Sequence, residues 1–314
     1  MQEAKIAYDT IQDAVSQCSS NCISLSGGLD SAITAYFLRE SMPNAITIIA
    51  KDFVATDLTY CQLVAQRFGL PLQIKLAEID EIYSAIEETV RILANFNEIE
   101  IRNNAVMYLA ISEVKRRGFS GIVTGDGADE LFAGYNFLVN KKESELKAEL
   151  DRISKIMHFP SQKIGKSLGV RVESPFCHPK VAEFARGLRT ELLVNTRDGK
   201  RFGKWILRKT FEDILPESVV WRHKAPMQEG AGTEALTEFF DRIIPDTLFF
   251  EKIKEIKERD GITIRNKESL KYYEIFRTHH RIPKSEERGI GCPDCGFAIE
   301  DGSRFCRMCG RFPV

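Results

Sequence analysis

The chain has 314 residues, of which 43% are hydrophobic and 28% charged, and its formal net charge is −1. This balance is typical of a globular protein with a sizeable core, and it gives no overall attraction to nucleic acid or to a membrane surface. No apolar run is long enough to cross a membrane and the first residues do not form a signal peptide, so we expect a cytoplasmic protein.

The first half of the chain alternates short apolar runs with amphipathic stretches. Strands are expected at residues 22–25, 45–50, 72–76 and 121–124, and helices at 3–18, 32–38, 57–68, 79–93 and 101–117. Strands that alternate with helices of this length indicate a parallel sheet covered on both faces. Ligands bind such sheets at the carboxyl ends of the strands.

A glycine loop, Ser26-Gly27-Gly28-Leu29-Asp30-Ser31, joins the first expected strand to the next helix. Two glycines let the backbone approach an anion, and the N-terminus of the helix attracts it. The lysine of the usual phosphate loop is absent, and an aspartate lies inside the turn, as expected if Mg²⁺ arrives with the phosphates. The hexapeptide resembles the pyrophosphate-binding loop of the ATP-pyrophosphatase enzymes, which cleave ATP to AMP and pyrophosphate. An ordinary strand-to-helix turn is the alternative.

An acidic segment, residues 125–135, follows the fourth expected strand and reads GDGADELFAGY. Its carboxylates Asp126, Asp129 and Glu130 lie within five residues, so they repel one another unless a cation or solvent compensates. The segment is either a solvated turn or, beside the glycine loop, a source of Mg²⁺ ligands and a proton acceptor.

After about residue 140 the alternation of strands and helices is lost, and the chain reads as mostly helical. We expect a charged helix at 141–155 and another helix at 181–188. Three parts are predicted: a sheet core at 1–140, a helical remainder at 141–285, and a small C-terminal domain at 290–314, with a linker at 281–291.

Four of the eight cysteines form two Cys-x-x-Cys-Gly pairs near the C-terminus: Cys292, Cys295, Cys306 and Cys309. Each pair turns two thiolates towards one point, and four thiolates make a closed tetrahedral Zn²⁺ site of the structural kind. We therefore expect a zinc ribbon whose folding depends on the metal, with a redox pair or an iron centre as the alternative. The remaining cysteines are scattered, which suits reduced thiols better than a disulfide framework.

Residues from about 15 to 280 resemble the synthetase domain of the asparagine synthetases and their relatives, including the β-lactam synthetases. The resemblance rests on the order of several motifs rather than on any one of them. They are the glycine loop, Ile-Arg-Asn-Asn at 101–104, the acidic segment, Ser-Pro-Phe at 174–176, Lys-Trp-Ile-Leu-Arg at 204–208, Trp-Arg-His-Lys at 221–224 and Gln-Glu-Gly-Ala-Gly at 228–232. The lysines at 204 and 224 keep the spacing of twenty residues found in the family.

The resemblance implies an α/β fold with a parallel five-stranded sheet and a helical remainder. It also implies a ligase that forms a C–N bond: ATP adenylates a carboxylate with release of pyrophosphate, and an amine attacks the acyl adenylate. The simplest substrates are aspartate and ammonia.

The resemblance assigns roles to particular residues. Lys224 is expected to neutralise charge on the phosphorus and on pyrophosphate, with help from Lys204, and Asp126 to accept a proton. Asp30 and Asp129 are expected to hold Mg²⁺. Contacts with ATP or pyrophosphate are expected from Ser24, Ser26, Gly27, Gly28, Asp30, Ser31, Thr124 and Gly125.

Two departures from the family bear on the nitrogen source. Asp126 stands where asparagine synthetases have a glutamate, and the shorter side chain moves the proton acceptor by about one methylene. The glutaminase domain of the family is expected to be missing, since only about twenty residues precede the first strand and Gln2 follows the first Met. Nitrogen is then expected from free ammonia, from a separate glutaminase, or from an amine on the substrate.

Two other functions remain open. ATP-pyrophosphatases with zinc ribbons that adenylate and thiolate tRNA bases are favoured by the C-terminal cysteines, whereas the acidic segment and the lysine pair favour amide synthesis. Cys61 and Cys177 are weak candidates for the cysteine that thiolation needs. The third possibility is a nucleotide-binding regulator without catalysis, against which Asp30, Asp129 and Lys224 argue.

Overall fold

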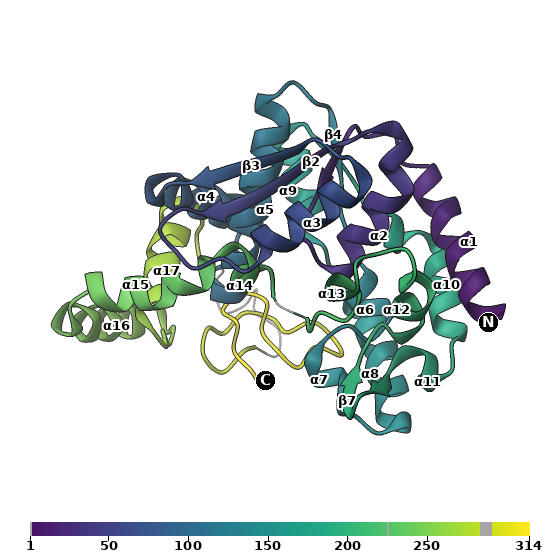
Figure 1. The fold of residues 1–314 in the computed structure, drawn as a ribbon. Helices are drawn as coiled ribbons and strands as arrows, with labels where there is room; N and C mark the ends of the chain where they lie inside the picture. The colour runs from purple at the N-terminus through teal and green to yellow at the C-terminus, as the bar shows by residue number, and fades with distance from the viewer. Residues whose placement is uncertain (1, 225, 283–290) are drawn as a thin grey trace.

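The protein is described by a computed structural model that covers residues 2–224, 226–282 and 291–314. A five-stranded parallel sheet runs through it in the order β3-β2-β1-β4-β5, which confirms the predicted α/β fold (Figure 1). The strands are β1 Cys22–Ser24, β2 Asn44–Ala50, β3 Leu72–Ala77, β4 Gly121–Val123 and β5 Arg171–Glu173.

Neighbouring side chains along the strands enter two separate hydrophobic cores, one on each face of the sheet. Ile23 and Val123 pack with the core on one face, while Cys22 and Ile122 pack with the core on the other. This follows from the two-residue period of a strand, and it is why these runs are apolar throughout rather than alternating. Strands buried on both faces leave their carboxyl ends as the accessible edge.

The helices divide between the two faces. The first core takes its side chains from α1 Gln2–Ser16, α2 Leu29–Leu38, α3 Asp57–Phe68, α10 Pro179–Gly187 and α12 Trp205–Phe211. The second takes them from α4 Ile79–Leu93, α5 Glu98–Arg116, α9 Pro160–Leu168, α14 Met227–Ala231, α15 Leu236–Ile243, α16 Asp246–Asp260 and α17 Lys267–His279.

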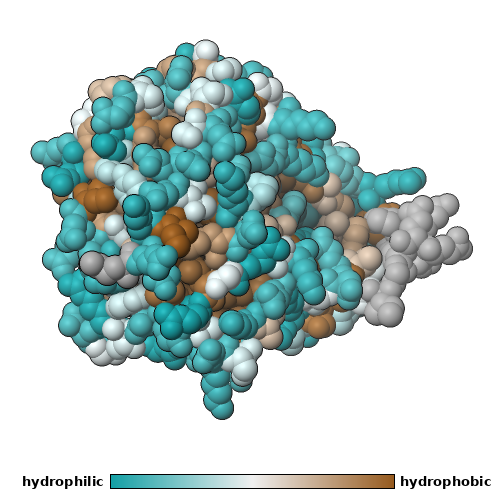
Figure 2. Space-filling view, turned by 90° about the vertical axis from the view of Figure 1, so that its right-hand side faces the viewer, coloured by the Kyte–Doolittle hydropathy of each residue, from teal (hydrophilic) through white to brown (hydrophobic). Residues whose placement is uncertain are grey.

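Shorter elements join these layers near the carboxyl ends of the strands. They are α6 Ala128–Leu131, α7 Asn136–Val139, α8 Glu143–Ile156, α11 Thr190–Leu193, α13 Glu217–Val220 and the hairpin of β6 Asn195–Arg197 with β7 Lys200–Phe202. Among the described helices, none is long and apolar enough to cross a membrane. On the face shown in Figure 2, hydrophilic side chains dominate and hydrophobic ones gather in hollows between them.

Strand β5 comes from the region predicted to be helical. It has three residues, and only Val172 is buried, so its sequence carries no apolar run. The strand pairs in parallel with β4 at Gly121↔Arg171. The sheet therefore draws on both sides of the boundary placed at residue 140, and that boundary does not separate the sheet from the helices. Of the predicted linker at 281–291, residues 283–290 lie outside the described part of the chain.

The C-terminal segment 291–314 packs against the rest of the protein between α17 on one side and α7 and α8 on the other (Figure 1). Backbone hydrogen bonds anchor it: Phe96 N donates to Met308 O (2.9 Å) and Thr263 N donates to Asp294 O (2.7 Å). Arg265 Nη2 donates to Cys309 O (2.6 Å). We call this segment the ribbon, and its contacts place it beside the first turn of α5.

Candidate active site

The glycine loop connects β1 to α2 and packs tightly on α3. Gly27 has φ +65°, and a Cβ there would lie 2.4 Å from Tyr60 Cβ, so only glycine fits. Ser31 Oγ donates to Gly28 O (3.1 Å) and accepts from Ser26 N (3.3 Å), which fixes the turn. The loop therefore presents the N-terminus of α2, with its unpaired N–H groups, at the carboxyl end of β1.

Two lysines and two aspartates meet beside this loop. Lys204 Nζ lies 2.5 Å from Asp30 Oδ2 and 2.6 Å from Asp129 Oδ1. Lys224 Nζ lies 2.7 Å from Asp129 Oδ2. The side chain of Lys204 is 4% exposed and that of Lys224 is 32% exposed, so Lys224 is the member that faces solvent. We call these four residues the lysine–aspartate network.

The network sets the charge of its members. Burial alone would raise the pKa of Asp129, but Lys204 and Lys224 outweigh it and hold that pKa well below the usual range. Burial alone would lower the pKa of Lys224, but Asp129 and Asp30 outweigh it and raise that pKa above its ordinary value. The ion pair of Asp129 with Lys224 therefore stays charged at neutral pH.

Lys204 reaches the two aspartates because of an unusual backbone and two glycines. Lys204 has φ +54°, a left-handed conformation that side chains rarely adopt and that marks functional sites. A Cβ on Gly134 would lie 2.0 Å from Asp129 Oδ1, and one on Gly203 would lie 1.9 Å from Ala133 O. Sequence reasoning missed both glycines, although each adjoins a motif that it had recognised.

Arg208 ties the helix after Lys204 to the segment before Lys224. It is buried and donates to Gly203 O (2.9 Å), to Arg222 O (3.1 Å) and to Val220 O. Burial lowers its pKa to about 10. The rings of Trp205 and Trp221 lie against each other near the same junction, with centroids 5.5 Å apart. These contacts hold the two lysine-bearing segments together.

Arg222 closes the other side of the site. Its Nη2 lies 2.8 Å from Asp57 Oδ1, and its guanidinium lies 3.9 Å from the centre of the Tyr60 ring. Arg208, Arg222 and Asp57 were not among the predicted site residues. The first two lie inside the recognised motifs, so the motifs carried a signal for them, whereas nothing in the sequence marked Asp57.

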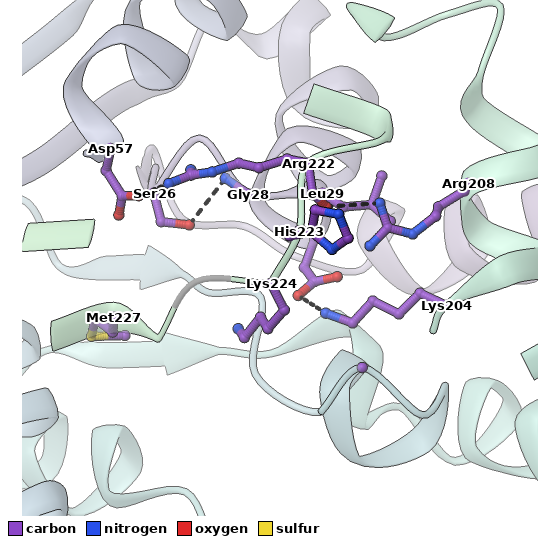
Figure 3. Close-up of a pocket in the computed structure, with 12 residues that line it drawn as sticks. Ser26, Gly28, Leu29, Asp57, Lys204, Arg208, Arg222, His223, Lys224 and Met227 are labelled. Carbon is purple, nitrogen blue, oxygen red and sulfur yellow. Dashed lines mark hydrogen bonds and ion pairs between the residues drawn. The ribbon is translucent and has the colours of Figure 1, made fainter. Parts of the chain in front are cut away.

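A small cavity opens between these groups, with lining residues drawn in Figure 3. Its wall contains four cationic side chains, Lys204, Arg208, Arg222 and Lys224, and two carboxylates. This excess of positive charge beside a helix N-terminus suits a polyphosphate.

The predicted site residues divide into three groups. Those on the cavity wall are Ser26, Gly28, Asp30, Lys204 and Lys224. Those behind it are Gly27 and Ser31 in the loop and Asp129 in the network. Ser24, at the end of β1, and Thr124, Gly125 and Asp126, which follow β4, are outside the wall.

Asp126 belongs to a different hydrogen-bond network. Its Oδ2 accepts from Thr124 Oγ1 (3.0 Å) and from Ser161 Oγ (2.6 Å). The hydroxyls of Thr124 and Ser174 lie 2.9 Å apart. Burial raises the pKa of Asp126, although the two hydroxyls oppose that shift. A carboxyl with a raised pKa and no ion pair among the described residues is suited to accept a proton.

The residues fit the two predicted metals, the Mg²⁺ that the resemblance implies and the Zn²⁺ that the cysteine spacing indicates. Asp30 Oδ1 is buried without a hydrogen-bond partner among the described residues, as expected of an oxygen available to Mg²⁺. The thiols of Cys292, Cys295, Cys306 and Cys309 are buried, with sulfur atoms within 4.8 Å of one another. The pairs Cys292–Cys309 and Cys295–Cys306 are each 3.6 Å apart, close to the roughly 3.8 Å edge of a zinc–thiolate tetrahedron.

Comparisons with known proteins agree with the motifs. A family model described as asparagine synthase matches residues 7–164 and 157–285. Asparagine synthetase [glutamine-hydrolyzing] 2 of Lotus japonicus is 28% identical, over 66% of this chain and 39% of that protein. The protein of the same description from Oryza sativa is 26% identical, over 84% and 48%. Asparagine synthetase B of Escherichia coli is 25% identical, over 90% and 55%.

The chain spans about half the length of the curated relatives it matches. The ribbon lies beyond the last residue of the family match, at 285. The names of these relatives give no support to the tRNA-modifying alternative.

Proposed function

This chain belongs to the asparagine synthase family, and from that premise we propose that it is an ATP-dependent amide synthetase. In the proposed reaction, ATP adenylates a carboxylate, pyrophosphate leaves, and a nitrogen nucleophile displaces AMP from the acyl adenylate. The observation that carries the proposal is the meeting of Lys204 and Lys224 with two aspartates at the glycine loop.

The glycine loop and the N-terminus of α2 bind the phosphates in this proposal. Ser26 and Gly28 lie on the cavity wall, and Gly28 places no side chain over the backbone there. Arg222, oriented by Asp57, and Lys224 add positive charge on the opposite side. Asp30 and Asp129 would hold Mg²⁺, which would supply positive charge to neutralise the phosphates.

The two lysines have different tasks. Lys224 is partly exposed and keeps its proton, so it stabilises the charge that develops on the α-phosphorus and on departing pyrophosphate. Lys204 is buried between two carboxylates, so it fixes their positions and balances their charge. The two lysines come from different segments, and Arg208 holds these segments together by donating to Gly203 O in one and to Arg222 O in the other.

Asp126 is the proposed proton acceptor for the nitrogen nucleophile. It lies at the end of β4, three residues from Asp129, and its hydroxyl partners Thr124 and Ser161 hold the carboxylate in one orientation. Aspartate and ammonia are the simplest substrates, with ammonia supplied free or by a separate glutaminase.

The test is pyrophosphate release from ATP and Mg²⁺ with aspartate and ammonium, each omitted in turn. Aspartate labelled with ¹⁸O in the side-chain carboxylate should transfer the label to AMP if an acyl adenylate forms. Lys224→Ala should lower release by about 10²-fold or more, since it removes a donor to the transition state. Lys200→Ala, at an exposed position in the β6–β7 hairpin, is the matched control.

Pyrophosphate release that depends on bulk tRNA instead of a carboxylate would overturn the proposal. Undiminished turnover by Lys224→Ala would remove the site assignment.

A further inference from the structure

A second cleft lies between the ribbon and the acidic segment, and the lysine–aspartate network does not line it. It has a volume of about 840 Å³, within the range of small-molecule sites. Three parts of the chain form its walls: the first turns of α5, the stretch from Glu130 to α8, and ribbon residues 304–312. We call it the ribbon cleft.

The outer part of the ribbon cleft is aromatic and open to solvent. The rings of Tyr135 and Phe137 stack with centroids 5.6 Å apart. Phe137 is 54% exposed, and Phe312 of the ribbon, which lines the same cleft, is 67% exposed. Large aromatic side chains left in water on the walls of one cleft indicate a ligand with an apolar body.

The wall of the ribbon cleft also carries the carboxylates of Glu130 and Glu100. Glu130 accepts a hydrogen bond from Tyr135 Oη (2.5 Å), and Glu100 accepts one from Asn95 Nδ2 (2.8 Å). Among the described residues, no lysine or arginine pairs with either; the nearest ionisable donor to Glu100 is His158, at 3.9 Å. Two carboxylates of this kind are suited to bind an ammonium group.

A third carboxylate in the cleft, that of Glu149, has its negative charge compensated by arginines. Glu149 Oε1 lies 2.6 Å from Arg152 Nη2, and its Oε2 lies 3.4 Å from Arg304 Nη2. Glu149 is therefore already neutralised by arginines, one of them from the ribbon. Burial raises the pKa of Glu100, but Arg307, which lines the same cleft, also acts on Glu100 to lower that pKa, so the contrast singles out Glu130 as the place for a ligand's positive charge.

The inner end of the cleft adjoins the proposed active site. Glu130 follows Asp129 in α6, and Asp129 Oδ2 is 2.7 Å from Lys224 Nζ. The charge of Glu130 is near enough to contribute to raising the pKa of Lys224. Adjacent residues of α6 thus belong to the two sites, Asp129 to the lysine–aspartate network and Glu130 to the wall of the ribbon cleft.

We propose that the ribbon cleft binds the nitrogen donor, and that this donor is a primary amine with an aromatic or apolar body. The ammonium lies at Glu130, and the body lies against the exposed rings of Phe137 and Phe312. This rests on the proposed function and names a substrate class for it. The amine nitrogen forms the bond to the acyl carbon, the C–O bond to AMP breaks, and AMP leaves with the electron pair. The two protons that the ammonium loses pass through Asp126 to solvent.

The ribbon is part of this site and lies outside the family match, so the donor need not be that of the relatives. Arg152 Nη1 donates to Gly302 O (2.9 Å), and Arg307 donates to Ile156 O. These bonds hold the ribbon against α8. The position of Phe312 therefore depends on the fold of the ribbon and on its four thiols.

Binding is measured first, without ATP, by calorimetry on the full chain. The probes are 2-phenylethylamine, its neutral counterpart 2-phenylethanol, and ammonium chloride. We expect saturable binding of 2-phenylethylamine that is at least about tenfold tighter than that of either of the other two. Phe137→Ala and Glu130→Gln should each weaken it by about tenfold. Phe250→Ala, at a position 62% exposed and outside the cleft, should leave it unchanged.

Turnover separates this proposal from the proposed function. Amide and AMP formed from the amine at concentrations where ammonium is inert support the proposal. If ammonium supports turnover and 2-phenylethylamine neither binds nor reacts, the amine donor is wrong and the amide synthetase stands. If Phe137→Ala and Glu130→Gln leave the binding of 2-phenylethylamine unchanged, the amine binds elsewhere, and the assignment of the ribbon cleft as its site is wrong.

Discussion

The acidic segment 125–135 carries two aspartates, three residues apart, that lie in opposite surroundings. Asp129 contacts two lysine ammonium groups, which hold its pKa well below the usual range. The carboxylate of Asp126 accepts hydrogen bonds from the hydroxyls of Thr124 and Ser161, and burial raises its pKa. One turn of chain therefore supplies both a fixed anion and a proton acceptor. The difference comes from partners far away in the sequence, because the two side chains are chemically identical.

The largest expected effect comes from removing the buried lysine, Lys204, which pairs with Asp129. Lys204→Ala leaves Asp30 and Asp129 buried with one cation fewer, so the free energy of unfolding should fall by about 3–5 kcal/mol. Pyrophosphate release should fall by about 10³-fold. Urea unfolding and turnover measure the two effects, with Lys200→Ala as the control. Unchanged stability would mean that the aspartates do not depend on Lys204.

Removing the exposed lysine should separate catalysis from stability. Lys224→Ala should lower turnover by about 10²–10³-fold, since Lys224 faces the cavity. The free energy of unfolding should change by less than about 1 kcal/mol, because the side chain is one-third exposed and Lys204 still compensates Asp129. A stability loss as large as that of Lys204→Ala contradicts this division of tasks.

Changing Asp126 should affect only the second half of the reaction. Asp126→Asn keeps a hydrogen-bonding side chain of the same size but cannot accept a proton, so amide formation should fall by about 10²-fold. Exchange of labelled pyrophosphate into ATP, which reports adenylation alone, should continue. Equal loss of exchange and amide formation would mean that Asp126, like Asp129, acts in adenylation rather than in the attack of the nitrogen nucleophile.

The smallest expected effect comes from Ser161→Ala, which tests the role of Asp126 as proton acceptor. Ser161→Ala removes a hydrogen bond that favours the ionised carboxylate, so the pKa of Asp126 should rise further. A hydrogen bond worth about 1 kcal/mol corresponds to an upward shift of roughly 0.7 pH unit. Asp126 is active when ionised, so activity is lost as pH falls through its pKa. The acidic limb of the pH–rate profile should therefore move to higher pH, while Ser154→Ala, on an exposed part of α8, leaves it in place.

The local elements were predictable because local patterns specify them. Helices α3 and α4 have the predicted bounds, since an amphipathic period runs between clear ends, and Gly69 ends α3 with φ +65°. Strand β5 was missed because three partly exposed residues carry no period. The glycine loop and the cysteine pairs were visible because their chemistry depends on neighbours in sequence.

Contacts between segments far apart in the sequence could not be predicted from local sequence patterns. The ion pair of Asp30 with Lys204 joins residues 174 positions apart, and only the family's motif order suggested that they belong to one site. The steric role of Gly134 depends on Asp129 and Lys204 approaching it from two segments. The ribbon cleft brings together Phe137 and Phe312, neither of which belongs to a pattern in the sequence.

The edge-to-face pair of Trp205 and Trp221 makes the proposed active site visible by spectroscopy. The chain has two tryptophans, and both lie in this pair, one directly after Lys204 and the other three residues before Lys224. All intrinsic indole emission therefore originates at the junction of the two lysine-bearing segments. A change in emission when ATP is added would report rearrangement of that junction in the unlabelled protein, and would give a real-time signal for each variant.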